Sequence, residues 1–309
     1  MATLLLTHPA CLQHDTSPGH PESAERLKAV LAALDAPEFA RLIRRQAPRA
    51  DLAAIARVHP RDFIDRCLAA VPKTGYAAID GDTILSPGSG EAALRAAGAL
   101  CAAVDGVMAG EADNAFCAVR PPRHHAEPTQ AMGFCLFNNV AIGALHARAA
   151  HGCARVAVVD FDVHHGNGTQ AAFEADPDLF FASTHQSPLY PGTGLASERG
   201  VGNIVNVPLD PGANGAEFRV ALREFILPAL SDFGPDFILI SAGFDGHRED
   251  PLANLNLTEE DFAWATREIL AVARACCDGR VVSTLEGGYD LDALAASVSA
   301  HVRELMAAP

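Results

Sequence analysis

The feature that most constrains the fold of this chain is a series of apolar, β-rich runs separated by helical patterns. These runs begin at Thr3 (TLLLTH), Ala115 (AFCAVR), Arg155 (RVAVVDFD), Leu179 (LFFASTH), Asn203 (NIVNVPL), Phe237 (FILISAGFD) and Arg280 (RVVSTLEGG). Several are continuous rather than alternating, which is typical of strands covered on both faces. Ala- and Leu-rich helical patterns cover 91–108, 138–150, 216–233 and 259–276. This alternation predicts an α/β fold with a central, mostly parallel sheet and helices on both faces.

Length and composition favour one domain. The chain has 309 residues, of which 49% are hydrophobic, so it can bury a large core. Its Gly- and Pro-rich stretches are short loops, and it has neither an internal repeat nor a low-complexity linker, so we expect a single domain over residues 1–309. Several of these loops follow strand ends, and ligands of open α/β sheets bind outside the carboxyl ends of the strands. Thr258, followed by three acidic residues, predicts the start of a helix.

Charge and cysteine usage argue against several classes of function. The net charge of −15, with scattered Lys and Arg, disfavours sequence-independent binding to nucleic acid, which needs a basic face. We find neither an uncharged span long enough for a membrane helix nor the basic and apolar regions of a signal peptide. The eight cysteines form no C-x-x-C pattern, which indicates reduced, buried thiols. We therefore expect a cytoplasmic protein that contacts neither nucleic acid nor a membrane directly.

Residues that can bind a metal follow two of the apolar runs. Asp162 and His164 come from DFDVHHG, and because they are two apart at a strand end, their side chains can point to the same side. Asp245 comes from SAGFDG. Two carboxylates and one imidazole suit a divalent metal, and three protein ligands leave a position open, as in catalytic zinc sites. Each residue alone is more simply a capping Asp or a packed His, but the set favours a metal site.

Two histidines and a tyrosine complete the candidate chemistry. His124 and His125 lie in the Pro-rich segment RPPRHHAEP, and imidazoles transfer protons near neutral pH. Asp160 and Asn167 flank the metal ligands and can each orient one histidine, of which the Asp partner gives the more basic imidazole. Tyr289 follows two glycines in LEGGYD, and a phenol there can donate to a developing oxyanion. Without the other segments, this residue would be interpreted as an ordinary half-buried tyrosine.

Together these segments resemble the zinc-dependent histone deacetylase family, which includes acetoin-utilisation proteins and bacterial deacetylase-like amidohydrolases. The matching motifs occur in order along nearly the whole chain: GHPESAERL, RPPRHHA, GFCLFNNVAIGA, DFDVHHGNGTQ, YPGTG, SAGFDGHREDPL and LEGGYD. GFCLFNN and Asn167 are similar to the class II branch. The resemblance implies a single arginase/deacetylase-type α/β domain. It also implies hydrolysis of an acyl amide, acetyl first of all, on a lysine side chain or related primary amine.

The resemblance also implies roles for the candidate residues. One catalytic zinc binds to Asp162, His164 and Asp245, and Tyr289 lies opposite it, so that both polarise the amide carbonyl. The histidines flank the water and the leaving amine, and the implied pairs are His124 with Asp160 and His125 with Asn167. We interpret the histidine with the Asp partner as the base and the other as the acid. Branches of the family differ on this point, and the opposite assignment stays open.

A substrate tunnel and two cation sites are implied as well. The tunnel residues would be Gly133, Phe134, Tyr190, Leu252 and Gly288. The tunnel position held here by Tyr190 is often Phe in the family. A potassium ion beside the zinc would be held by Asp160, Ser183 and Thr184, with backbone oxygens of Asp162 and His164. A second, looser cation site would fall on Phe173, Asp176, Leu179 and Phe218.

Substrate choice leaves alternatives. Family members that prefer acetylated polyamines carry a glutamate after an Asp-Pro pair at the mouth of the site, where REDPL gives this chain Leu252. An apolar residue there predicts a preference for acetyl-lysine peptides. The alternatives are an acetylpolyamine amidohydrolase, a two-manganese ureohydrolase in which Asp250 would serve the metals, and a non-catalytic acyl- or metabolite-binding protein. The acyl length, the oligomeric state and the choice between zinc and ferrous iron stay open.

Overall fold

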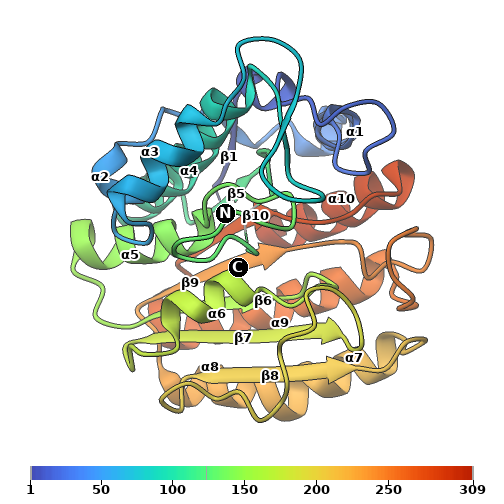
Figure 1. The fold of residues 1–309 in the computed structure, drawn as a ribbon. Coiled ribbons are helices and arrows are strands. Elements are labelled where there is room, and N and C mark those ends of the chain that lie inside the picture. Colours follow the sequence, from blue (N-terminus) through green and yellow to red (C-terminus); the bar gives the residue numbers. More distant parts are fainter. Residues whose placement is uncertain (1, 123, 308–309) are drawn as a thin grey trace.

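A sheet of parallel strands runs through the computed structural model, which describes residues 2–122 and 124–307 (Figure 1). Within these residues the sheet has eight strands in the order β2-β1-β5-β10-β9-β6-β7-β8. They are β1 (Thr3–Thr7), β2 (Ile43–Gln46), β5 (Asn114–Cys117), β6 (Val156–Asp160), β7 (Leu179–Gln186), β8 (Ile204–Leu209), β9 (Phe237–Ala242) and β10 (Val281–Leu285). Each neighbouring pair in this sheet is parallel. The predicted α/β class and parallel sheet are confirmed.

The helices form two layers around the sheet. They are α1 (Ala24–Leu34), α2 (Leu52–Ile55), α3 (Arg61–Ala69), α4 (Ser89–Met108), α5 (Asn139–His151), α6 (Asn167–Phe173), α7 (Gly215–Ala221), α8 (Leu227–Phe233), α9 (Glu259–Cys277) and α10 (Leu291–Ala307). On one face α4 packs on α5, and on the other α10 packs against α1 and α9 (Figure 1). Among the described residues, no helix has both the length and the hydropathy needed to span a bilayer.

Burial explains which strands the sequence pattern predicted. Every residue of β5, β6, β9 and β10 is buried, as the continuous apolar runs indicated. The edge strand β2 has the sequence IRRQ and is exposed throughout, so it lacks the apolar pattern and was not predicted. Its two arginines suit an edge, because charge there deters pairing with another chain. A short antiparallel hairpin of β3 (Ala77–Ala78) and β4 (Ile84–Leu85) lies outside the main sheet.

The predicted helix over 216–233 is divided in three. A π-helical segment, Leu222–Ile226, separates α7 from α8. Pro228 lies in the first turn of α8 and has no N–H to donate to the preceding turn. The turn before it therefore widens, and the N–H of Leu227 bonds to the carbonyl of Leu222 five residues back. Helix α9 begins after Thr258 as predicted, with a capping box in which the Asp261 carboxylate accepts from the Thr258 N–H at 2.9 Å.

Candidate active site

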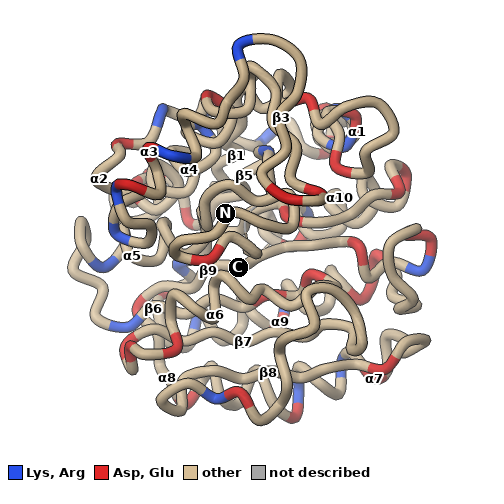
Figure 2. Tube along the Cα trace, viewed as in Figure 1, with Lys and Arg blue, Asp and Glu red and all other residues tan. Residues whose placement is uncertain are grey.

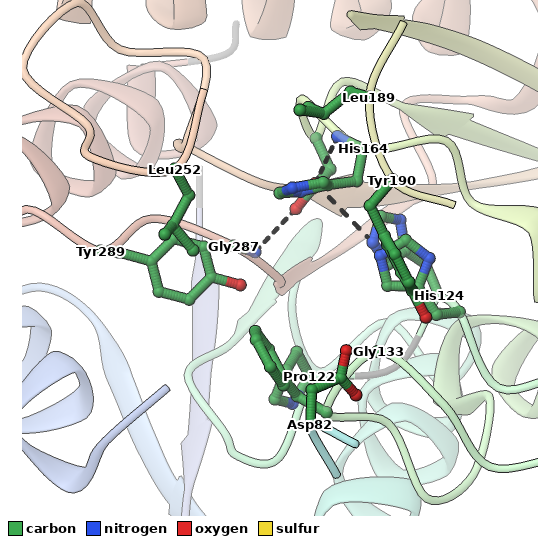
Figure 3. Close-up of a pocket in the computed structure, with 13 residues that line it drawn as sticks. Asp82, Pro122, His124, Gly133, His164, Leu189, Tyr190, Leu252, Gly287 and Tyr289 are labelled. Atoms are coloured by element: carbon green, nitrogen blue, oxygen red, sulfur yellow. Dashed lines mark hydrogen bonds and ion pairs between the residues drawn. The ribbon is translucent and has the colours of Figure 1, made fainter. Parts of the chain in front are cut away.

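The candidate residues lie in loops at the carboxyl ends of five neighbouring strands. The order β5-β10-β9-β6-β7 brings these ends together at one edge of the sheet. The loops surround a cavity of about 240 Å³ (Figure 3). Its lining residues are Asp82, Pro122, His124, His125, Gly133, Phe134, Asp162, His164, Leu189, Tyr190, Leu252, Gly287 and Tyr289. The edge where parallel strands end is therefore the candidate site, as expected for an open α/β sheet.

Two of the lining residues, Asp162 and His164, form a metal-ligating group with Asp245, which lies buried behind them. The Nδ1 atom of His164 lies 3.2 Å from Asp162 Oδ1 and 3.1 Å from Asp245 Oδ2. One ligand atom from each residue lies within 4.8 Å of the other two. Both carboxylates are buried, and two charged groups so close together are costly unless a cation compensates them. Two carboxylate oxygens and one imidazole nitrogen are a donor set that fits a divalent metal.

The pKa values of the two carboxyls show how strongly they interact. Burial raises the pKa of Asp245, and the charge of Asp162 raises it further. Burial also acts to raise the pKa of Asp162, but His124 and His164 outweigh it and hold this pKa well below its usual range. Only glycine fits at position 287, because a Cβ atom there would collide with both carboxylates. The glycine therefore keeps the space between the two ligands open.

Each of the two adjacent histidines has the partner that the resemblance implies. His124 Nδ1 lies 2.9 Å from Asp160 Oδ2, and His125 Nδ1 lies 2.9 Å from Asn167 Oδ1. Burial lowers the pKa of His124, but the carboxylates of Asp160 and Asp162 outweigh it and raise the pKa to about 10. Burial lowers the pKa of His125 well below its usual range, and the neighbouring imidazoles add to this. The two rings therefore differ in protonation, with their centroids 4.0 Å apart.

Tyr289 is held from two sides. Its backbone N–H donates to Asp250 Oδ2 at 2.7 Å, and the guanidinium of Arg26 lies 4.8 Å from the centre of its ring. Burial raises the pKa of Tyr289 well above its usual value, so the phenol keeps its proton. The hydroxyl points into the cavity (Figure 3). Asp250 also accepts from the N–H of Leu252, so it supports backbone rather than joining the metal-ligating group.

Four of the five expected tunnel residues line the cavity. Phe134 and Tyr190 are among its lining residues. Leu252 lies beside Tyr289 (Figure 3). Phe134 has a φ of 68°, a left-handed conformation that is strained for a bulky residue, and its N–H donates to Thr83 Oγ1. The preceding Gly133 also lines the cavity, whereas Gly288 does not. The carbonyl of Gly288 instead accepts a hydrogen bond from Arg26 Nε.

The expected cation ligands are only partly brought together. Asp160 and Ser183 are register partners on β6 and β7, with Thr184 next along the strand, and all three are buried. Burial raises the pKa of Asp160 to about 6, although His124 opposes this. The loose site differs from the expectation, as three of its four residues share one partner, Asn203. The fourth, Phe218, lies in α7, where its carbonyl accepts from the helix.

The amide nitrogen of Asn203 lies among three of the carbonyl oxygens named for the second cation site. Its Nδ2 lies 2.9 Å from the carbonyl oxygens of Phe173 and Asp176 and 2.6 Å from that of Leu179. The amide is oriented by its other end, because Oδ1 accepts from the N–H of Val201 at 3.2 Å. An amide nitrogen has two hydrogens for these three carbonyls. A neutral side chain therefore donates to three of the four residues named for this site.

Sequence reasoning missed a buried charge network behind the site. Arg26 and Glu22 are fully buried and belong to the GHPESAERL segment, in which their opposite charges four residues apart were the available signal, although Glu22 lies just before α1 begins. Arg26 donates to the carbonyls of Glu286 and Gly288, and Glu22 binds Arg120 through both carboxylate oxygens. This network fixes the loop after β10 that carries the tyrosine. The lining residue Asp82 was also missed, because its segment has no distinguishing pattern.

Known proteins are similar to this chain in sequence and in fold. A family model described as the histone deacetylase domain matches residues 20–305. Histone deacetylase 14, chloroplastic, of Arabidopsis thaliana is 39% identical over 99% of this chain and 77% of that protein. The histone deacetylase-like amidohydrolase of Pseudomonas aeruginosa is 40% identical over 90% of this chain and 74% of that protein. The solved structure of the HDA15 HD domain is 35% identical, with a TM-score of 0.94 over 99% of this chain and 90% of that chain.

Proposed function

The chain belongs to the histone deacetylase family, and from this we propose that it is a zinc-dependent amidohydrolase. Its reaction is hydrolysis of an acyl amide, acetyl first of all, on a lysine side chain or a related primary amine. The products are acetate and the free amine. The observation that carries the proposal is the convergence of a metal-ligating group, a histidine pair and a tyrosine on one cavity.

The ligands of the zinc would be Asp162, His164 and Asp245. Their buried carboxylates and single imidazole fit a catalytic zinc, for which three protein ligands leave room for water and substrate. Zinc bound there acts as a Lewis acid on the amide carbonyl and on the attacking water. Ferrous iron accepts similar ligands, so the metal in the cell is a question for metal analysis.

The histidine pair moves the protons of the reaction. One imidazole takes the proton of the attacking water and the other gives a proton to the leaving amine. Our choice of base is His124, because of its Asp160 partner, with His125 as the acid; the pKa directions of the metal-free chain, which leave His124 protonated and His125 neutral, favour the opposite assignment. In the metal-free chain His124 keeps its own proton, held there by Asp160 and Asp162. His124 would give up this proton more readily if the charge of Asp162 were compensated by a bound metal.

Tyr289 donates a hydrogen bond to the carbonyl oxygen as negative charge develops on it. Its high pKa keeps the phenol neutral and able to donate throughout the working pH range. Arg26 and Asp250 are positioning residues, since they hold the ring and the backbone of this tyrosine without lining the cavity. The remote charge network thereby keeps the donor in place.

The substrate enters as an extended acyl-lysine chain. Phe134 and Tyr190 line the cavity with aromatic rings, which suits an aliphatic stem better than a charged one. Leu252 at the same cavity offers no charge to a distal ammonium, so acetyl-lysine peptides are preferred over acetylated polyamines. The partner is thus an acylated lysine peptide or protein, with an acetylated small amine as the alternative. Direct binding to nucleic acid is not expected, since Lys and Arg are scattered over the elements (Figure 2).

A potassium ion beside the zinc belongs to the proposal. Asp160 supplies a buried carboxylate, and Ser183 and Thr184 lie against it on the neighbouring strand. A monovalent cation there would compensate the buried charge. The proposed compartment is the cytoplasm, supported by a sequence whose eight cysteines form no C-x-x-C pattern, since disulfides are rare in reducing compartments. Residues 1–309 would form a single catalytic domain.

Turnover assays with three substrates distinguish the proposal from its alternatives. A fluorogenic acetyl-lysine peptide, N-acetylputrescine and arginine are each incubated with the purified holoenzyme. The proposal expects the largest kcat/KM for the acetyl-lysine peptide. Release of urea from arginine with manganese would identify a ureohydrolase. Binding of the peptide without acetate release would identify a non-catalytic binding protein.

A further inference from the structure

A second group of metal-ligating side chains lies where the end of α4 meets the end of α5 (Figure 1). Asp105 is in the last turn of α4, and His146 and His151 are five residues apart on α5. The Nε2 atoms of both imidazoles lie 2.7 Å from Asp105 Oδ1. One ligand atom from each residue lies within 4.8 Å of the other two. We propose that Asp105, His146 and His151 bind a second zinc ion.

The donor set and its exposure suit this ion. Two imidazole nitrogens and one carboxylate oxygen are ligands that zinc takes, and a water completes the tetrahedron. Donor atoms around a tetrahedral zinc lie about 3.3 Å apart, so the carboxylate moves outward from its 2.7 Å contacts. Asp105 has room for this movement, because its side chain is 52% exposed. The imidazoles of His146 and His151 are 14% and 24% exposed, so an ion can reach them from solvent.

Arg57 opposes zinc binding in the metal-free chain. Its Nη1 lies 3.0 Å from His146 Nδ1, and a guanidinium only donates, so Nδ1 accepts and Nε2 carries the proton of a neutral ring. Zinc at Nε2 requires the other tautomer, in which Nδ1 carries the proton and faces Arg57. Arg57 must then turn away into solvent, where its side chain already lies exposed. Removing this arginine should therefore strengthen zinc binding.

The site is remote from the candidate active site. Helix α5 starts beside the catalytic loops, where Asn138 Nδ2 lies within 3.4 Å of the carbonyl oxygen of His124. The second group lies on the C-terminal half of this 13-residue helix, roughly 12–20 Å along the axis from Asn138. An ion there joins α4 to α5 and binds the folded state only, so it stabilises the fold by mass action. The proposal therefore does not rest on the proposed function.

The test is a zinc titration of holoenzyme that already holds one zinc per chain, followed by calorimetry and by thermal unfolding. We expect wild type to bind one further zinc and to gain in Tm. The His146→Ala/His151→Ala variant should bind no further zinc and show no gain. Asp105→Asn, which keeps a similar shape, should weaken the binding by about tenfold or more. Arg57→Leu should bind about tenfold more tightly than wild type, the usual scale for one hydrogen bond to a charged group.

Two controls keep the outcome clear. His8→Gln removes a partly exposed histidine elsewhere and should leave the second zinc unaffected. Asp245→Asn removes a proposed catalytic ligand and should keep this zinc, so failure of the catalytic proposal is seen separately. Circular dichroism without zinc checks that each variant folds. The proposal is overturned if wild type binds no further zinc, or if Asp105→Asn and the double variant both bind it as tightly as wild type.

Discussion

One hydroxyl group, that of Tyr289, faces the metal-ligating group across the cavity. We expect Tyr289→Phe to fold normally and to lose about two orders of magnitude or more in kcat, the usual scale for one oxyanion donor. KM should change much less, because the donor acts mainly on the developing charge. Tyr190→Phe is the matched control and should keep most of its activity. Steady-state kinetics on an acetyl-lysine peptide decide, and an unchanged kcat in Tyr289→Phe would contradict the role given to this phenol.

A second residue, Leu252, is expected to set substrate choice. Leu252→Glu adds a carboxylate at the cavity, where a charge-assisted contact with a distal ammonium is worth roughly 1.5–3 kcal/mol. The ratio of kcat/KM for acetylspermidine over an acetyl-lysine peptide should therefore rise at least about tenfold. Leu252→Gln is the control of similar size without charge. Wild-type protein that already prefers acetylated polyamines would show that substrate choice lies elsewhere.

Most site residues were predictable because each carries a chemical signal in the sequence. Asp162, His164 and Asp245 are polar groups directly after apolar strands, and such placement is costly without a partner. Arg26 carried only its spacing of four from Glu22, and its contact with the loop after β10 joins residues more than 250 positions apart. Asp82 came from a loop without a pattern. Contacts made by tertiary packing alone were beyond what the sequence could predict.

Between the elements, Asn203 joins the α6–β7 connection to the start of β8. We expect Asn203→Ala to lower the free energy of unfolding by about 1–2 kcal/mol, since three carbonyls each lose one donor, although those of Phe173 and Asp176 keep a backbone donor. The space left can then accept a potassium ion, so the Tm of the variant should rise with KCl but not with choline chloride. The Tm of wild type should change less when choline chloride is replaced by KCl. Equal responses in both proteins would argue against the amide as a substitute for the cation.

The same scale shows where pattern reasoning works for the fold. Strands β5, β6, β9 and β10 were predictable because burial on both faces leaves a continuous apolar run. The exposed edge strand β2 has no such run, since only its pairing with β1 holds it. The break in the helix over 216–233 follows from Pro228. This proline is visible in the sequence, but the prediction was made from the spacing of apolar residues, which a proline does not change. Edges and irregular turns therefore escaped the prediction.

For the whole molecule, a buried neutral histidine should make stability depend on pH. His301 is fully buried, with its ring nitrogens 2.6 Å from Thr266 Oγ1 and 2.8 Å from Ser283 Oγ. Burial lowers the pKa of His301 to about 3. At pH values between about 3 and the unfolded pKa near 6.5, this histidine is protonated in the unfolded chain but neutral in the folded one. The stability that it contributes is therefore fully present above about pH 6.5 and is lost as the pH falls below that value.

The titration of His301 alone should lower the free energy of unfolding by about 2 kcal/mol from pH 7 to pH 5. His301→Gln cannot take up the proton, and its amide can still bond to the same two hydroxyls. Urea unfolding at several pH values should therefore give the variant a shallower loss of stability with acid than wild type. Identical slopes for both proteins would show that His301 is not the group that titrates.

The central claim is that Asp162, His164 and Asp245 hold a zinc on which turnover depends. The most direct measurement is acetyl-lysine turnover by chelated, metal-free protein during titration with zinc. We predict that the metal-free chain is inactive, that turnover rises in proportion to added zinc, and that it stops rising once one zinc per chain occupies this site. Asp245→Asn should stay inactive throughout the titration. Full turnover in the metal-free chain, or in Asp245→Asn without zinc at this site, would contradict the account.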